Sequence, residues 1–173
     1  MIQPINMKKL IILASLLCIA NLSFAQYALS KGQAQLNAGL GLSSWGVPIY
    51  VGFDVGVHPD ISVGGELSFR SYNDNWKGND YDHNIIGFSA NGNYHFNTIL
   101  DIPREWDFYA GLNLGFYVWN TDNDDYKGDG SSGVGLGAQV GGRYYFNERF
   151  GINLEVGGAN AFSGGKFGIT LKL

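Results

Sequence analysis

The sequence predicts an all-β fold: an eight-stranded antiparallel up-and-down transmembrane β-barrel, preceded by a cleaved signal peptide. Three observations predict it. Eight segments beyond residue 30 alternate apolar with polar or small residues, which is the two-residue period of a strand. These segments carry few charges, and several of the connections between them alternate between tight turns and long polar loops.

The first 25 residues have the form of a secretory signal peptide. Lys8 and Lys9 supply a positive start, residues 10–20 form an apolar run, and small residues precede Gln26. The apolar run is shorter than the ~18–20 residues that a membrane-spanning helix needs. We therefore expect a signal peptide over 1–25 and an outer-membrane β-barrel domain over 26–173.

The composition of the remaining chain excludes several classes of function. Cys18 lies in the expected signal peptide, so the mature chain has neither a disulfide nor a thiolate metal site. Nine basic and fifteen acidic side chains give the mature chain a net charge of −6, which argues against a nucleic-acid partner.

Each expected strand has one apolar face and one polar or small face. In the second strand, Ile49, Val51 and Phe53 share one face, while Tyr50 and Asp54 share the other. The eight strands are expected at about 33–44, 49–58, 61–72, 84–97, 106–119, 133–146, 150–160 and 165–173.

Charge density indicates which face meets water. A soluble barrel of the lipocalin kind would turn its polar face outward. The eight expected strands hold about 96 residues, of which only eight are charged, or about 8 % against ~25 % in ordinary soluble chains. A face of Gly, Asn, Ser and Tyr suits a packed interior, so we expect the apolar face to meet lipid.

The connections predict which end of the barrel faces out of the cell. The turns at 59–60 and 147–149 are tight, whereas 73–83 and 120–132 are long and polar. Short turns on the periplasmic side and long loops outside are typical of outer-membrane barrels. Two links, 45–48 and 98–105, do not follow this alternation.

The last eight residues, KFGITLKL, predict how the barrel closes. Residues 36–42 are expected to pair with 167–171, which leaves no open strand edge facing lipid. The string also resembles the C-terminal sorting signal of outer-membrane barrels, carried by Lys166, Gly168, Leu171 and Leu173.

Residues 26–173 resemble the small eight-stranded outer-membrane barrels of the OmpX and OmpA-barrel kind. The resemblance rests on the signal peptide, the eight alternating segments and the C-terminal string. It implies a monomer in the lipid of the Gram-negative outer membrane, inserted by the barrel-assembly machinery. It also implies a structural or surface-interaction role through the outer loops, with a partner outside the cell.

The alternation places several charged residues inside the barrel. Asp54, Glu66, Arg143 and Glu155 are expected at similar height, with Arg143 bridging carboxylates and Lys172 assisting. Five polar side chains are expected to complete this lumen network: Asn91, Asn113, Gln139, Tyr109 and Tyr145. Eight strands enclose a space that side chains just fill, so we expect a closed lumen, with a narrow porin-like channel as the alternative.

No pattern predicts catalysis, a cofactor or a metal site. Ser71, His83 and Asp82 at the outer rim could form a Ser–His–Asp set, which keeps a lipid-modifying enzyme as a third hypothesis. His58 and His95 are expected to point inward near the periplasmic end. The glycine-rich segment 133–142 lacks the spacing of a dinucleotide loop, and the acidic loop 122–130 lacks the spacing of an EF-hand.

Overall fold

The computed structural model describes residues 29–43, 46–76, 79–121, 132–158 and 164–173, except the side chains of 74–81 and 121. The expected signal peptide, residues 1–25, lies outside these residues. Among the described residues, no helix has the length and hydropathy needed to cross a bilayer.

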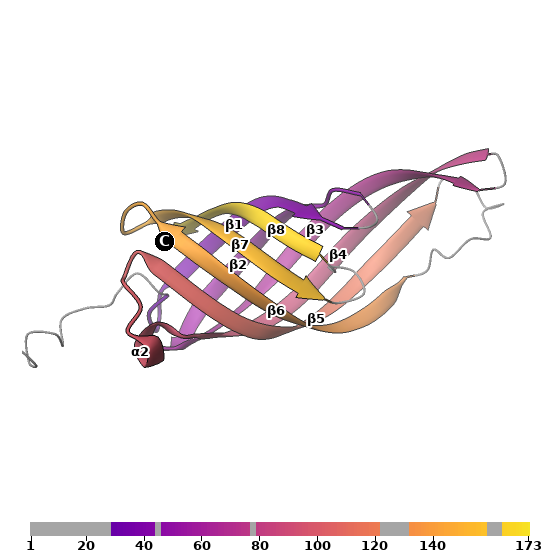
Figure 1. The fold of residues 1–173 in the computed structure, drawn as a ribbon. Helices are drawn as coiled ribbons and strands as arrows, with labels where there is room; N and C mark the ends of the chain where they lie inside the picture. Colours follow the sequence, from indigo (N-terminus) through magenta and orange to yellow (C-terminus); the bar gives the residue numbers. More distant parts are fainter. Residues whose placement is uncertain (1–28, 44–45, 77–78, 122–131, 159–163) are drawn as a thin grey trace, which may run out of the picture.

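Eight strands form one closed antiparallel barrel, in which each strand pairs with the next and β8 pairs with β1 (Figure 1). The strands are β1 (Ala34–Leu42), β2 (Ile49–His58), β3 (Ile61–Trp76), β4 (Asn79–His95), β5 (Trp106–Thr121), β6 (Gly133–Tyr145), β7 (Phe150–Gly158) and β8 (Gly164–Lys172). The predicted fold class is therefore confirmed. So is the closing pair, with Leu36 opposite Leu171 and Leu40 opposite Phe167.

The two ends of the barrel differ in their connections. One end, which we call the turn end, carries the tight turns and the short helix α2 (Asn97–Leu100). The opposite end, the loop end, carries the long β3–β4 hairpin, which extends beyond the neighbouring strands (Figure 1). The link at 98–105 thus contains part of helix α2. The residue that caps the end of this helix, Asp101, has a left-handed backbone conformation, with φ 49°.

The expectation of a long loop at 73–83 is wrong, because the two strands continue through it. Asn73 pairs with Asp82 and Trp76 with Asn79, so only 77–78 lie between β3 and β4. The Asn73 amide also donates a hydrogen bond to Asp82 Oδ1 at 2.9 Å. Apolar residues are too few in this stretch of the sequence to alternate with polar ones, yet backbone pairing does not require apolar side chains.

Hydrogen exchange of the purified barrel tests this extension. The backbone amides of 73–76 should exchange at least about tenfold more slowly than an unstructured chain, because those that donate across the ladder must open before they exchange. Exchange at the unstructured rate throughout 73–76 and 79–82 would contradict the extended hairpin.

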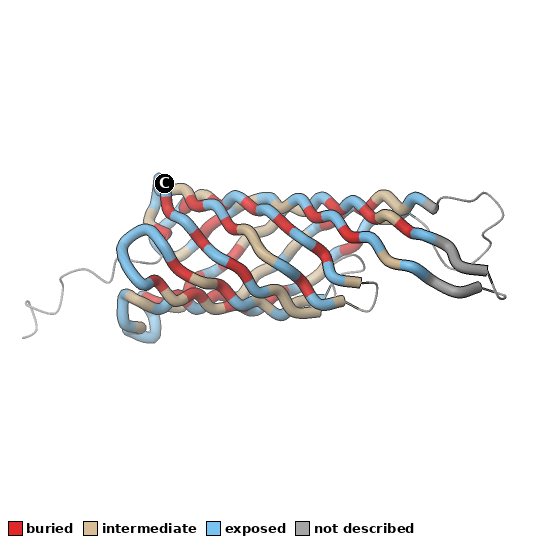
Figure 2. Tube along the Cα trace, turned by 90° about the horizontal axis from the view of Figure 1, so that it is seen from above, coloured by how far each residue is buried: buried red, intermediate tan, exposed pale blue. Residues whose placement is uncertain are grey.

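The outer surface is apolar and the interior is polar, the inverse of a soluble protein. In β2, Ile49 is 54 % exposed, whereas Tyr50 and Asp54 are buried. The same alternation of buried and exposed residues runs along the other strands (Figure 2). Exposed apolar strand faces of this extent suit hydrocarbon rather than water.

Aromatic rings form a belt around the outside at the turn end. Trp106 stacks on Phe108, with centroids 5.5 Å apart, and contacts Tyr144 at 4.8 Å. The chain of rings continues from Tyr144 to Phe146 and on to Phe150. A ring belt at this level is typical of the bilayer interface.

Candidate functional site

The lumen near the turn end is organised around Arg143. This arginine, on β6, is 3 % exposed and bridges two carboxylates. Its Nη1 lies 3.0 Å from Asp107 Oδ2 on β5, and its Nη2 lies 3.1 Å from Asp54 Oδ2 on β2. Because all three groups are buried, each charge depends on its partner for stability. We call Arg143, Asp54 and Asp107 the arginine cluster.

Neutral side chains complete the arginine cluster. Gln35 and Asn37 on β1 both donate to Asp54 Oδ2, at 3.1 and 2.8 Å. His95 on β4 lies 2.7 Å from Asp107 Oδ1 through Nδ1 and 2.9 Å from Ser62 Oγ through Nε2. The carboxylate oxygens of both aspartates therefore contact side chains from several strands. These contacts connect β1, β2, β4, β5 and β6 across the lumen.

A second cluster, the lysine cluster, consists of Lys166, Glu66 and Glu155. Lys166 Nζ on β8 lies 2.9 Å from Glu66 Oε2 and 2.7 Å from Glu155 Oε1. The Tyr109 hydroxyl donates to Glu155 Oε2 at 2.8 Å, and the Tyr109 ring lies 4.2 Å from the Arg143 guanidinium carbon. Tyr109 therefore couples the two clusters.

The described lumen is balanced in charge. Its charged side chains are four carboxylates and four basic groups: Asp54, Glu66, Asp107 and Glu155, with Arg70, Arg143, Lys166 and Lys172. The Lys172 ammonium lies 4.1 Å from the centre of the Tyr145 ring. Balanced pairing lowers the cost of burying each ion.

Little space remains between the two clusters. Where they meet, a cavity of about 20 Å³ is bounded by residues that include Asp54, Glu66, Asn91 and Tyr109. A single water molecule needs ~10–15 Å³ by this kind of measure. At this level the described lumen has room for about one water molecule and no continuous column of them.

Two further features fill the lumen. Gly141 leaves room for the Tyr109 ring, since a Cβ atom at Gly141 would lie 2.4 Å from Tyr109 Cζ. At the turn end, Leu29 is fully buried, and the segment that follows it is held by Gly32 N donating to Gly56 O at 2.8 Å. Leu29 and the segment after it thus add packing at the turn-end mouth.

In the structure, the cations of the predicted lumen network contact different carboxylates from those expected from the sequence. Arg143 does contact Asp54, but its other carboxylate is Asp107, and Glu155 pairs with Lys166 instead. The reason is that Arg143 is directly opposite Asp107 on β5 and only diagonal to Glu155 on β7, whereas Glu155 is directly opposite Lys166 on β8. Directly opposed side chains of opposite charge therefore pair in preference to the diagonal pair.

The remaining predicted network members all lie in the lumen. Asn91 donates to Asp54 at 3.3 Å, and Asn113 donates to Gln139 at 2.7 Å. Tyr145 donates to Gln35 at 2.9 Å. Asp107 and His95 are members of the network that were not predicted, although alternation from Tyr109 and Tyr94 places both on the inward face.

Two expectations about histidines need correction. The His58 side chain is 59 % exposed beside Asp60, not inward, because a register irregularity separates Gly56 from His58 at the end of β2. His83 is buried and accepts a hydrogen bond from Trp119 Nε1 at 3.2 Å. Ser71 is one residue from Tyr72, the partner of His83 in the ladder, so its side chain is on the opposite face.

Ser62, His95 and Asp107 have the hydrogen-bond order of a catalytic triad. Ser62 is completely buried, however, and Asp107 is also bound by Arg143. A nucleophile must reach a substrate carbonyl. This set therefore acts as part of the packed lumen in the described state.

No group of three or more His, Cys, Asp or Glu side chains in the described ranges is arranged to hold a metal ion. The acidic segment 122–130 lies outside those ranges.

The four residues that resemble a sorting signal lie on both faces of β8 and just after it. Lys166 and Gly168 face inward, and a Cβ atom at Gly168 would lie 2.6 Å from the Tyr50 hydroxyl. Leu171 and Leu173 are 39 % and 59 % exposed on the apolar outer surface. Their role as a sorting signal stays a prediction.

Solved structures share this architecture. The N-terminal β-barrel domain of Pseudomonas aeruginosa OprF is 17 % identical with a TM-score of 0.58, covering 83 % of this chain and 98 % of that domain. The chain has the fold of the small eight-stranded outer-membrane β-barrels. OprG from Pseudomonas aeruginosa is 10 % identical with a TM-score of 0.63, covering 85 % of this chain and 98 % of its own.

A third similar structure was solved with a bound ligand. Yersinia pestis Ail, the attachment invasion locus protein, was solved with the heparin analogue sucrose octasulfate. It is 14 % identical, covers 82 % of this chain and 96 % of its own, and has a TM-score of 0.51. No family model matches the chain, and no curated protein matches it.

Proposed function

We propose that this chain is an outer-membrane protein with a filled lumen, whose role is structural or surface-interacting through its loop end. The observation that carries the proposal is the inverted burial of the barrel, apolar outside and ion-paired inside. In this proposal the signal peptide of 1–25 is removed, the assembly machinery inserts the barrel, and the mature protein is a monomer in lipid.

The proposal orients the barrel with the turn end in the periplasm and the loop end outside the cell. Tight turns on the periplasmic side are the rule for this fold. The long β3–β4 hairpin then projects beyond the membrane surface, where a partner outside the cell can reach it (Figure 1). Adhesive or protective contacts are the kind of function that such a projection supports.

A filled lumen favours this role over a channel. Between the clusters, the described lumen has a cavity of about 20 Å³, which has room for about one water molecule. Ions need a continuous wet path, so conduction through the barrel would require the arginine and lysine clusters to rearrange together.

Cysteine labelling in intact cells tests both the location and the orientation. The mature chain of the proposal has no cysteine, so Asp82→Cys and Glu148→Cys each give one thiol, at exposed positions of the loop end and the turn end. A maleimide on a large polyethylene-glycol chain should modify Asp82→Cys in intact cells. It should modify Glu148→Cys only after the outer membrane is permeabilised.

Equal labelling of both variants in intact cells, or labelling of Glu148→Cys alone, would contradict this orientation. Heat-modifiable migration of both variants in detergent gels serves as the folding control, since each substitution lies at an exposed site.

A further inference from the structure

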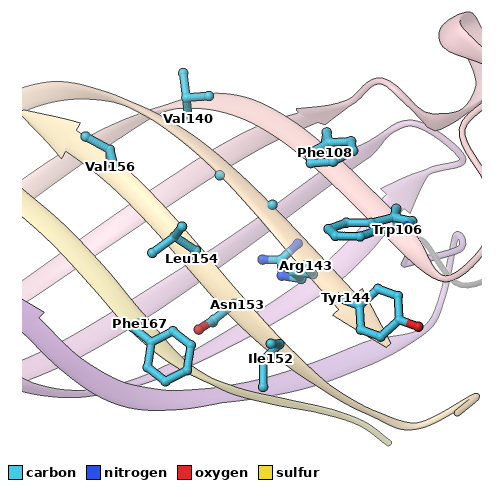
Figure 3. A pocket seen from close by; sticks show the side chains of 12 residues that line it. Trp106, Phe108, Val140, Arg143, Tyr144, Ile152, Asn153, Leu154, Val156 and Phe167 are labelled. Carbon is cyan, nitrogen blue, oxygen red and sulfur yellow. The ribbon is translucent and has the colours of Figure 1, made fainter. Parts of the chain in front are cut away.

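A deep apolar groove crosses the outer surface of β5, β6, β7 and β8 towards the turn end. Its volume is about 650 Å³, within the ~300–1,000 Å³ range of small-molecule sites. Trp106, Phe108 and Tyr144 form one wall, and Leu154 and Phe167 form the other (Figure 3).

Gly142 is one of the residues that line the groove. Gly142 is directly opposite Phe108 on β5 and Leu154 on β7, both large residues. A Cβ atom at Gly142 would lie 3.0 Å from the Phe108 ring. The Phe108 ring therefore packs over the backbone at Gly142, on the β5 side of the groove.

Charged groups of both signs lie beyond the turn-end limit of the groove. Tyr144 pairs with Ile152, and the β6–β7 turn that holds exposed Glu148 and Arg149 lies about 10 Å further along the strands. Arg149 Nε donates to the Lys172 carbonyl at 3.3 Å, which holds the guanidinium at the rim. Arg104 and Glu105, just before β5, form an exposed pair at 3.1 Å.

We propose that this groove binds one acyl chain of a zwitterionic phospholipid, with the lipid phosphate at Arg149. The inference rests on the proposed membrane location, because only there does hydrocarbon surround the groove. An acyl chain matches the apolar walls, and a guanidinium matches a phosphate in geometry and charge.

The balance of charge at the rim selects the headgroup. Arg104 and Arg149 can each approach a phosphate, while Glu105 and Glu148 offer carboxylates to an ammonium group. A rim of two arginines and two glutamates has no net charge and suits a headgroup that also has none. Aromatic side chains at the same level place this headgroup at the interface.

Tryptophan quenching by brominated lipids tests the site directly. When Trp45, Trp76 and Trp119 are replaced by phenylalanine, Trp106 in the groove wall is the only tryptophan left in the chain. The protein is reconstituted into mixtures of brominated phosphatidylcholine with an unbrominated galactolipid that lacks phosphate, and into the reverse pair. The quenching gives the relative association of the two lipids at Trp106.

The parent protein should favour the phospholipid by roughly fivefold, the effect of one hydrogen bond from Arg149 to the lipid phosphate. Arg149→Gln should bring this preference close to one. Gly142→Leu should do the same, because the new side chain displaces the Phe108 ring that forms a wall of the groove, while Gly92→Leu, at an outward glycine with open space around it, should keep the preference.

Equal association of the two lipids in the parent protein would overturn the lipid site, as would a preference that survives Arg149→Gln. Either result leaves the membrane location intact, because Trp106 is still quenched by both brominated lipids. If neither brominated lipid quenches Trp106, the proposed membrane location is overturned instead. Heat-modifiable migration checks that each leucine variant is folded.

Discussion

Arg143→Met should lower the free energy of unfolding by about 3–5 kcal/mol, because it leaves Asp54 and Asp107 buried without their cation. The measurement is a urea titration of the barrel in detergent or liposomes, followed by tryptophan fluorescence. Lys31→Met removes the same charge from an exposed site, and its effect should stay within about 0.5 kcal/mol.

The origin of the Arg143 effect can be separated from simple loss of packing. Adding Asp54→Asn and Asp107→Asn to Arg143→Met removes the unpaired charges while keeping similar volume. This triple variant should regain at least half of the lost stability. A cost below about 1 kcal/mol for Arg143→Met alone would show that the arginine cluster does not hold the barrel together.

Gly141→Leu should destabilise the barrel by about 2–5 kcal/mol, since its side chain needs the space that the Tyr109 ring occupies. Displacing that ring also breaks the hydrogen bond from Tyr109 to Glu155 and the contact with Arg143. The same urea titration measures the loss.

A second substitution identifies the clash as the cause. Tyr109→Ala in the Gly141→Leu background frees the space, so the double variant should be more stable than the sum of the two single effects predicts. Gly92→Leu, which faces open space outside, is the matched control and should change stability little. Additive single effects would mean that residues 109 and 141 do not compete for one space.

The eight strands could be predicted from the sequence because the signal is local. Alternation such as Ile49, Val51 and Phe53 against Tyr50 and Asp54 depends only on the two-residue period of a strand. The β3–β4 hairpin was predicted too short because its continuation from Asn73 has too few apolar residues to show the alternation. Backbone pairing there leaves no trace in an apolar pattern.

The partners within the lumen could not be predicted in the same way. That Glu66 meets Lys166, while Arg143 meets Asp54 and Asp107, depends on how strands that are not neighbours are staggered across the barrel. Stagger is a property of the closed barrel rather than of any one segment. Which residues face inward was accessible from the sequence, but which of them touch each other was not.

Single-channel recording of the purified barrel in planar bilayers, bathed in concentrated KCl, tests the filled lumen most directly. The arginine and lysine clusters with only a cavity of about 20 Å³ between them predict a silent protein, even where folded insertion is verified by heat-modifiable migration. Steady cation-preferring conductance steps that disappear on Glu66→Gln, under conditions that keep the barrel folded, would contradict the filled lumen.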